Sequence, residues 1–303
     1  MNKTTAMNRT PCMNKTDAHA HAFVTDFPDP KFVYMPSPSR LKEVYAQIGV
    51  SHALLLPLTA PERHAFFCPT EHVMAISHAD PKTFSFAMYL DPRMLQHGTD
   101  SDFSPLINYY ISKGAVSVGE MQANVPFDSP LFDNLFSQIE SFGLPVTLHL
   151  SPAVGHEYGV VDSPGLPGLE RALRKFPKLV FVGHSQSFWA HMSAEVDSEI
   201  MKRYPKGKVT PGRIWTLLDE YPNLYCDLSA GSGFNALTRD EEKGLEFLRR
   251  YSHRLMFGCD FCDPTGFPPL AAWLDGQYLA GNLDDETYMN ICRNTAERVF
   301  GIG

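Results

Sequence analysis

The feature that most constrains the fold is the nearly even spacing of eight short apolar runs along the 303-residue chain. The runs begin near Asp17, Ala53, Phe84, Ala115, Val146, Leu179, Leu224 and Leu255. The intervals between their starts are 36, 31, 31, 31, 33, 45 and 31 residues. Runs that are apolar throughout are typical of strands covered on both faces, as in parallel sheets.

Amphipathic stretches lie between these runs and predict helices. They span Ser39 to Ile48, Ser129 to Phe142, Pro164 to Phe176, Pro211 to Tyr221, Arg239 to Tyr251 and Asp284 to Phe300. Eight strand–helix units of about 31 residues predict an α/β fold of the (β/α)8 TIM-barrel type. A doubly wound parallel sheet is the alternative. It is disfavoured because the units are nearly equal and no Gly-x-Gly-x-x-Gly follows the first run.

The spacing also predicts the domain boundaries. Residues 1–16 are polar and repeat a Met-Asn-Lys/Arg-Thr unit, so we expect a flexible N-terminal tail, followed by one barrel domain over residues 17–303. The single long interval follows the sixth strand and carries about a dozen extra residues. Insertions after a barrel strand lie at the catalytic mouth. We therefore expect Gln186 to Gly212 to form a lid or a wall of the substrate pocket.

Composition excludes several functional classes. The formal net charge is −8, which argues against a nucleic-acid partner, since that needs clustered Lys and Arg. No apolar run approaches the roughly 20 residues of a membrane span, and no secretory signal is evident. The six cysteines are scattered, which fits reduced thiols in a cytoplasmic protein. We assign no redox or metal role to the close pair Cys259 and Cys262.

Six ionisable residues recur at matching depths in these strands. They are His19, His21, Glu120, His149, His184 and Asp260. All six fall near the carboxyl ends of their strands, where barrel active sites form, and closure of the barrel brings the last strand beside the first. Burying them without a cation would be costly. The set therefore predicts a divalent metal site, with Zn²⁺ the best match and Mn²⁺ or Fe²⁺ as alternatives.

The strand motifs DAHAH, VGE, LHL, FVGHS and FGCD resemble those of the amidohydrolase superfamily. The closer resemblance is to the amidohydrolase-related (amidohydrolase 2 type) branch of metal-dependent TIM-barrel hydrolases, and it covers residues 17–303. One departure is that Glu120 stands on strand four in place of a carboxylated-lysine motif, which resembles the TatD-like nuclease pattern. The motifs are specific for fold and metal but not for substrate.

The resemblance implies a hydrolase in which a metal-activated water attacks an amide, lactone or ester bond of a small molecule. His19 and His21 would hold a first metal with Asp260, and His149 and His184 a second, with Glu120 bridging the two. Asp260 is the candidate for moving the proton from water to the leaving group. In a one-metal version, His149 completes the first site and His184 polarises the substrate carbonyl.

Two other functions remain open at this stage. Some members of the branch are metal-dependent lyases, either non-oxidative decarboxylases or hydratases of aromatic or unsaturated carboxylic acids, and they use nearly the same ligands in a one-metal site. A barrel with a purely structural metal is disfavoured, because the ligands lie in an open mouth and not in a closed cage. The number of metals, one or two per chain, stays open, and a homodimer is expected only from the family.

Three residues near the mouth are weaker substrate-binding candidates. Arg93 follows strand three and is a candidate to clamp a substrate carboxylate, although an ion pair with Asp91 is the alternative. Phe188 and Trp189 directly follow His184 and are candidates for an apolar pocket wall, or alternatively for core packing.

Three further loop features are weaker still. His156 and His191 follow strands five and six, and solvated surface positions are the favoured interpretation for both. The run Ser229 to Gly233 follows strand seven, and an anion-binding nest is less favoured there than an ordinary glycine-rich turn.

Overall fold

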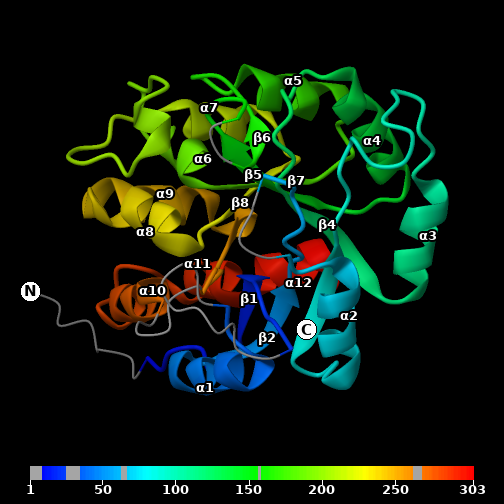
Figure 1. Ribbon diagram of the computed structural model, residues 1–303. Coiled ribbons are helices and arrows are strands. Elements are labelled where there is room, and N and C mark those ends of the chain that lie inside the picture. The colour runs from blue at the N-terminus through cyan, green and yellow to red at the C-terminus, as the bar shows by residue number, and fades with distance from the viewer. Residues whose placement is uncertain (1–8, 25–34, 63–66, 156–157, 262–267) are drawn as a thin grey trace, which may run out of the picture.

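Eight parallel strands form a barrel in the computed structural model, which describes residues 9–24, 35–62, 67–155, 158–261 and 268–303 (Figure 1). The strands of the barrel are β1 (Lys15–Ala20), β2 (Val50–Leu55), β3 (Phe84–Met88), β4 (Ala115–Met121), β5 (Val146–Ser151), β7 (Phe181–His184), β8 (Leu224–Asp227) and β9 (Leu255–Met256). They pair in the order β1-β2-β3-β4-β5-β7-β8-β9. A two-residue strand, β6 (Val160–Val161), pairs only with β5.

Backbone hydrogen bonds link the last strand to the first. The amide of Ala18 donates to the carbonyl of Phe257 at 3.0 Å, and the amide of Asp260 donates to the carbonyl of His19 at 2.8 Å. These bonds nearly close the sheet, so the predicted (β/α)8 barrel is confirmed and the doubly wound alternative is wrong. Closure also places Asp260 beside His19.

Helices surround the barrel. Five of the predicted helices appear as α1 (Pro38–Ile48), α4 (Pro130–Ser141), α5 (Pro167–Lys175), α7 (Arg213–Glu220) and α9 (Glu241–Tyr251). The last predicted helix is divided into α11 (Asp285–Met289), the π-helix η3 (Asn290–Asn294) and α12 (Thr295–Phe300). The structure adds α2 (Thr70–Ala79), α3 (Ser104–Ser112), α8 (Ala230–Thr238) and α10 (Pro269–Leu279). Short 3-10 turns are η1 (Ile200–Lys202) and η2 (Ser252–Arg254).

Ser-Pro pairs start two of the predicted helices. Ser37 precedes Pro38 in α1 and accepts a hydrogen bond from the Arg40 amide, and Ser129 precedes Pro130 in α4 and accepts one from the Leu131 amide. A serine cap satisfies an amide that has no partner in the helix, and proline at the first helical position has no amide to leave unpaired. Local sequence therefore fixes where these helices begin.

The first strand, β1, begins two residues before the predicted domain boundary at residue 16. Lys15 and Thr16 belong to β1 and are fully buried. The Lys15 ammonium donates to the carbonyls of Cys12 and Ile48 and pairs with Asp275 at 3.0 Å. Before the strand, the Arg9 guanidinium donates to the carbonyl of Leu283, so this segment is docked on the barrel. Residues 1–8 lie outside the described residues.

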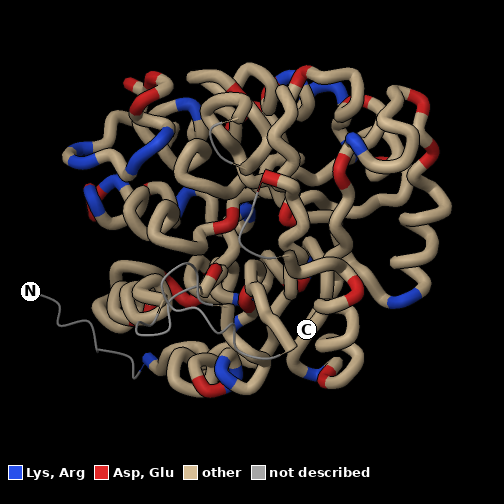
Figure 2. The backbone as a smooth tube through the Cα atoms, viewed as in Figure 1, with Lys and Arg blue, Asp and Glu red and all other residues tan. Residues whose placement is uncertain are grey.

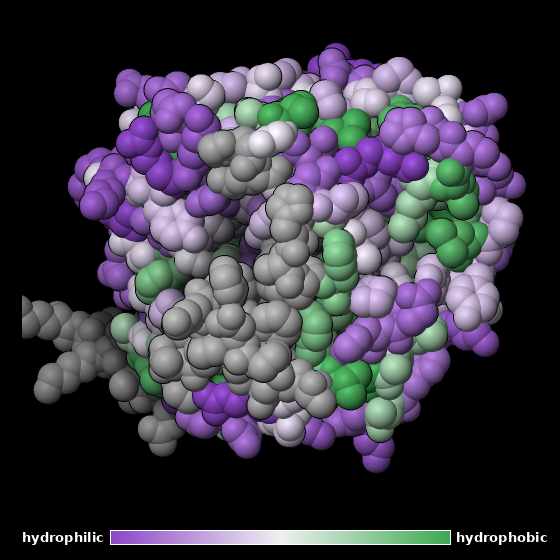
Figure 3. Space-filling model, viewed as in Figure 1, coloured by the Kyte–Doolittle hydropathy of each residue, from purple (hydrophilic) through white to green (hydrophobic). Residues whose placement is uncertain are grey.

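The surface is mixed in charge and mostly polar, and the described cysteines form no disulfide. Figure 3 shows a largely hydrophilic face with apolar side chains in separate patches, and Figure 2 shows Lys and Arg alternating with Asp and Glu around the barrel. No described helix has the length and apolar character needed to cross a membrane. The described cysteines, which do not include Cys262, are free thiols, and four of the five are buried.

The insertion after β7 is a structured segment. It opens with α6 (Gln186–Ala190), passes through η1 and closes where Ser193 and Pro211 form a short antiparallel bridge. His191 lies at the end of α6 and is 1% exposed, so its interpretation as a solvated surface residue is wrong. Its Nδ1 donates to the Ser187 carbonyl at 2.9 Å, and its Nε2 accepts from the Gly165 amide at 3.0 Å.

Close packing requires glycine at position 183, in the middle of the FVGHS motif. The Phe188 ring turns back from α6 and lies directly on β7 at Gly183, so that a Cβ atom at this position would overlap the ring. Phe188 is fully buried and part of the main hydrophobic core. The ring therefore docks the start of the insertion onto the strand that carries His184.

We expect Gly183→Ala to lower the free energy of unfolding by about 1–3 kcal/mol, because the added methyl group forces the buried Phe188 ring to move. Gly276→Ala in α10 is the matched control, since nothing lies within 4 Å of the added Cβ there. It should be neutral or stabilising by up to about 1 kcal/mol. Urea unfolding of both variants gives the two values, and equal stabilities would contradict this account.

We expect His191 to make stability depend on pH. Burial lowers the pKa of His191 from 6.5 to about 4, so between these values the unfolded chain binds the proton more readily. The free energy of unfolding that depends on neutral His191 is fully present above pH 6.5 and is lost as the pH falls toward 4. Between pH 7 and pH 5 this costs about 2 kcal/mol. Urea unfolding at both pH values should show a smaller loss in His191→Gln than in the wild type; an equal loss would assign the dependence to other groups.

Candidate metal centre

The six ionisable residues predicted at the strand ends lie together at one end of the barrel. His19, Glu120, His149 and His184 belong to β1, β4, β5 and β7. His21 directly follows β1, and Asp260 lies in the loop after β9. Their nitrogen and oxygen atoms form three overlapping sets, each within 4.8 Å: His19, His21 and Glu120; His19, His184 and Asp260; and Glu120, His149 and His184. Five of the six side chains are 12% exposed or less, and that of Asp260 is 20% exposed.

His19 and His21 turn their Nε2 nitrogens toward each other. The Nδ1 of His21 lies 2.9 Å from the Leu56 carbonyl, which can only accept, so this nitrogen carries the proton. The Nδ1 of His19 lies 2.6 Å from a carboxylate oxygen of Asp227 and is protonated for the same reason. The two Nε2 atoms are 3.1 Å apart. Two lone pairs at this distance repel unless a proton or a metal cation lies with them, so this donor set fits a divalent cation.

Asp227 fixes two of the imidazoles, and the sequence reasoning missed it. It ends β8, and its Oδ2 lies 2.6 Å from His19 Nδ1 and 3.1 Å from His184 Nδ1. Ser229 donates its hydroxyl to the same oxygen at 2.8 Å. A carboxylate on the outer nitrogen of a histidine sets its tautomer and raises the basicity of the inner nitrogen. Its place at a strand end, in LYCDLSA, is the signal that could have identified it.

Glu120 faces both halves of the cluster. Its Oε2 lies 3.7 Å from His19 Nε2 and 3.6 Å from His21 Nε2. Its Oε1 lies 2.5 Å from His149 Nδ1 and 4.0 Å from His184 Nε2. Gln122 donates its amide to Oε2 at 2.8 Å. The two oxygens of one carboxylate are therefore divided between two histidine pairs.

Burial and the contacts among the six residues determine their protonation states. Burial by itself would raise the pKa of Glu120, but the neighbouring His149 and His19 hold it well below the ordinary value. Burial likewise opposes ionisation of Asp260, and the His19, His21 and His184 imidazoles outweigh it and lower its pKa. Burial and the charge of His19 lower the pKa of His21 to about 4. At neutral pH the cluster therefore presents two carboxylates and a neutral His21. Burial opposes the charged form of His19, but Asp227 and Asp260 outweigh it and raise the pKa of His19 well above its ordinary value, so a cation bound here displaces a proton from this imidazole.

A second buried carboxylate shapes the backbone around the cluster. Asp17, the first residue of DAHAH, accepts hydrogen bonds from the amides of His19 at 3.0 Å and Cys259 at 2.9 Å and from the Tyr45 hydroxyl at 2.8 Å. It therefore ties the end of β1 to the loop that leads to Asp260. Gly258 is needed in that loop because a Cβ there would lie 2.6 Å from an Asp227 oxygen.

Arg93 does not present free donors to a substrate. Its guanidinium forms paired hydrogen bonds with both oxygens of Asp91, at 2.9 and 2.6 Å, and its terminal nitrogens reach both oxygens of Glu62, at 2.6 and 3.3 Å. The planar fork is therefore occupied by two carboxylates of the protein. The substrate-clamp interpretation is corrected to an internal ion-pair network.

Phe188 and Trp189 are also core residues and do not form a pocket wall. Phe188 is 0% and Trp189 2% exposed. The Trp189 indole donates to the carbonyl of Asp227 at 3.0 Å. Trp189 therefore supports the strand end that holds Asp227.

The run from Ser229 to Gly233 follows β8 and begins a helix. Ser229 precedes α8, and its hydroxyl lies 3.2 Å from His184 Nδ1. Residues 230–233 form the first turn of that helix. His156 lies outside the described residues.

Comparisons with known proteins agree with this architecture. Residues 113–302 match the sequence model of a family described as amidohydrolase, and no curated protein matches the chain. A solved amidohydrolase from Burkholderia multivorans with bound zinc is similar at 12% identity and a TM-score of 0.61, over 96% of this chain and 100% of that one. A probable 2-pyrone-4,6-dicarboxylic acid hydrolase from Acinetobacter baumannii has 13% identity and a TM-score of 0.57, over 95% and 100%.

A third solved structure belongs to a different reaction class. The 2,6-dihydroxybenzoate decarboxylase from Rhizobium has 15% identity and a TM-score of 0.56, over 95% of this chain and 98% of that one. At such identities the likenesses show the barrel fold. They include hydrolases and a decarboxylase alike.

We expect Asp227→Asn to weaken zinc binding by about 10- to 100-fold, because the amide no longer holds both imidazoles with a full negative charge. Competition with a chromophoric chelator measures the change. Asp162→Asn is the matched control: Asp162 is equally buried and accepts the amides of Gly168 and Leu169, each at 2.9 Å. It should lower stability without changing zinc affinity, and a similar loss in both variants would count against a role for Asp227 at the metal.

Proposed function

Because the chain belongs to the amidohydrolase family, we propose that it is a metal-dependent hydrolase that cleaves an amide, lactone or ester bond of a small molecule. The observation that carries this proposal is the division of the Glu120 oxygens between the His19/His21 pair and the His149/His184 pair. A carboxylate placed in this way can bridge two cations, as paired-metal hydrolases require.

The chain offers ligands for such a pair. His19, His21 and Asp260 would hold one cation, His149 and His184 the other, and Glu120 would lie between them. Zn²⁺ suits these mixed nitrogen and oxygen donors. When bound, the cation supplies Lewis acidity that activates water and a carbonyl oxygen.

Asp260 is the best placed group for proton transfer. Its side chain is the most exposed of the six, at 20%, so it faces the open end of the site. Its Oδ1 lies 3.4 Å from His21 Nε2 and its Oδ2 3.6 Å from His184 Nε2. Because its pKa is lowered, it is a carboxylate at neutral pH and can accept a proton from water. The same group can then deliver that proton to the leaving atom.

His184 is oriented to act on the substrate carbonyl if a single metal is bound. Asp227 and Ser229 hold its Nδ1, at 3.1 and 3.2 Å, so its Nε2 points into the cluster. A fixed polar group at this place stabilises developing charge without reorganising during the reaction.

The second candidate function is a lyase, a metal-dependent decarboxylase or hydratase of an aromatic or unsaturated carboxylic acid. The observation that favours it is the 2.5 Å contact between Glu120 Oε1 and His149 Nδ1. If that hydrogen bond persists with metal bound, Glu120 fixes a histidine tautomer instead of bridging, and the site holds one cation.

A substrate panel separates the two functions. Metal-reconstituted protein is assayed with amides, lactones, esters, phosphodiesters and aromatic carboxylates side by side. Hydrolysis of a neutral ester or lactone supports the hydrolase and excludes decarboxylation as the main activity. Release of CO₂ selects the lyase.

We expect Asp260→Asn to lower turnover by about 100-fold or more while the protein keeps bound metal. Asparagine retains one oxygen for the cation but cannot accept a proton from water. Turnover and metal content are measured on the same preparation, with Asp162→Asn as the control for removal of a buried charge. Near wild-type turnover in a metal-loaded Asp260→Asn protein would exclude Asp260 as the general base.

Glu120→Ala should separate the two functions by metal content. If Glu120 bridges two cations, the wild type binds two per chain and the variant loses one preferentially. Elemental analysis after reconstitution gives both numbers, and Gln122→Ala tests whether loss of the neighbouring amide suffices. One metal per chain in the wild type, unchanged in Glu120→Ala, would leave the lyase as the better proposal.

A further inference from the structure

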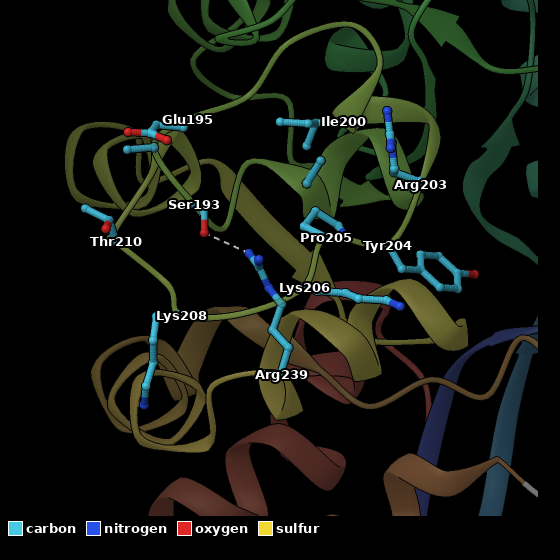
Figure 4. Close-up of a pocket in the computed structure, with 12 residues that line it drawn as sticks. Ser193, Glu195, Ile200, Arg203, Tyr204, Pro205, Lys206, Lys208, Thr210 and Arg239 are labelled. Atoms are coloured by element: carbon cyan, nitrogen blue, oxygen red, sulfur yellow. Dashed lines mark hydrogen bonds between the residues drawn. The ribbon is translucent and has the colours of Figure 1, made fainter.

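A cavity of about 850 Å³ lies within the insertion after β7, and none of the six cluster residues lines it. Its walls come from the end of α6, from residues 193–210 of the insertion and from Arg239 after α8 (Figure 4). This volume is in the range of cavities that hold small molecules. Four basic side chains line it, Arg203, Lys206, Lys208 and Arg239, against one acidic side chain, Glu195.

Arg239 is a half-buried cation that forms no ion pair among the described residues; the nearby carboxylate of Asp240 acts on it only at longer range and pairs with Lys208. Its Nη2 donates to the Ser193 hydroxyl at 2.8 Å, as the dashed line in Figure 4 shows. Its Nε is buried and has no hydrogen-bond partner among the described residues, and no ion pair of the described chain includes it. A guanidinium stays charged in proteins, and desolvating it without a counter-charge is costly. The group is therefore arranged for an anion that comes from outside the chain.

The other charges leave the cavity net positive. Lys208 pairs with Asp240 at 3.2 Å and points away from the other side chains in Figure 4. Lys206 has no partner among the described side chains and points to the same side as the Tyr204 ring. Glu195 is exposed at the far rim. Lys206 therefore adds to the positive charge of the cavity, on the side away from the Arg239 guanidinium in Figure 4.

Two contacts join this cavity to the metal centre. Tyr204 lines it, and its hydroxyl packs on Gly231, where an added Cβ would lie 3.1 Å away. Gly231 is two residues after Ser229, which contacts His184. Ala190 also lines the cavity and follows Trp189, which donates to the carbonyl of Asp227. Burial and the charge of Asp260 both raise the pKa of Tyr204, which agrees with a phenol that faces the metal centre.

We propose that this cavity binds an anionic group of the substrate, a carboxylate or a phosphate, at Arg239, with Lys206 contributing to the positive charge of the cavity. The inference rests on the proposed function, since it assigns the substrate class: a small acid whose charged group lies away from the bond that reacts. The neutral part of the substrate would then extend past Tyr204 toward His184 and Asp260.

The first test measures anion binding alone. Calorimetric titrations of the metal-loaded protein with inorganic phosphate and with succinate are compared with the same titrations of Arg239→Gln, Arg239→Lys and Arg40→Gln. Arg40 is a control arginine on α1, paired with Glu43. We expect Arg239→Gln to weaken binding of the preferred anion at least tenfold, Arg239→Lys to weaken it less, and Arg40→Gln to leave it unchanged. Absence of saturable binding, or binding unchanged in Arg239→Gln, overturns the proposal.

The second test asks whether the bound anion belongs to the substrate. For a substrate found in the panel, an acid and its neutral methyl ester or amide are compared. Arg239→Gln should raise KM for the acid about tenfold with little change in kcat, and should not alter KM for the neutral analogue. The titrated anion should inhibit competitively. Anion binding that depends on Arg239 but does not compete with substrate overturns the assignment to the substrate. Because binding is measured without turnover, a failed hydrolase assay leaves the first test intact.

Discussion

The arrangement of the candidate centre depends on one buried carboxylate. Asp227 ends β8 and binds the outer nitrogens of His19 on β1 and His184 on β7, so a single side chain fixes imidazoles from two different strands. Burial would by itself raise the pKa of Asp227, but the two histidines overcome this and hold it far below the ordinary value. The charge is therefore permanent, and it turns both inner nitrogens toward the centre. Three neighbouring residues depend on Asp227. Gly258 leaves room for its side chain, Ser229 donates a hydrogen bond to its carboxylate, and Trp189 donates one to its backbone carbonyl.

The barrel makes this interaction available by bringing strands of distant sequence to the same depth. Asp227 and His19 are separated by 208 residues, yet the parallel order and the bonds between β9 and β1 place their strand ends side by side. Asp17 reinforces the closure by accepting amides from both β1 and the loop after β9. Desolvation of the buried carboxylates and the repulsion between Glu120 and Asp260 oppose this convergence, and a cation relieves both. Burial of the apolar strand residues thus stabilises a fold that brings together six ionisable side chains.

The sequence predicts the barrel and the six converging residues because both follow from periodicity. Even spacing of apolar runs specifies strand number, and position within a run specifies depth. What it does not predict depends on contacts between distant residues. Arg93 is occupied by Glu62, which lies 31 residues earlier, and Phe188 is buried because Gly183 leaves space for its ring. Asp227 resembles an ordinary strand-end aspartate until two histidines are seen to face it. The sequence does not predict the helices α2 and α3, because their apolar residues are only weakly confined to one face of the helix.

The division between strands and loops also explains why function is harder to assign than fold. The strand ends hold a donor set that serves hydrolysis and decarboxylation equally well, so the chemistry of the centre alone leaves the substrate open. The insertion after β7 is the place where this chain departs from its own repeat, and it begins directly after His184. Its first turn is anchored by buried Phe188 and Trp189, whereas its outer part carries exposed basic side chains around a cavity. The residues that orient the candidate metal centre and those that line the cavity are different side chains of neighbouring elements, so a substitution at the cavity leaves the contacts of Asp227 in place.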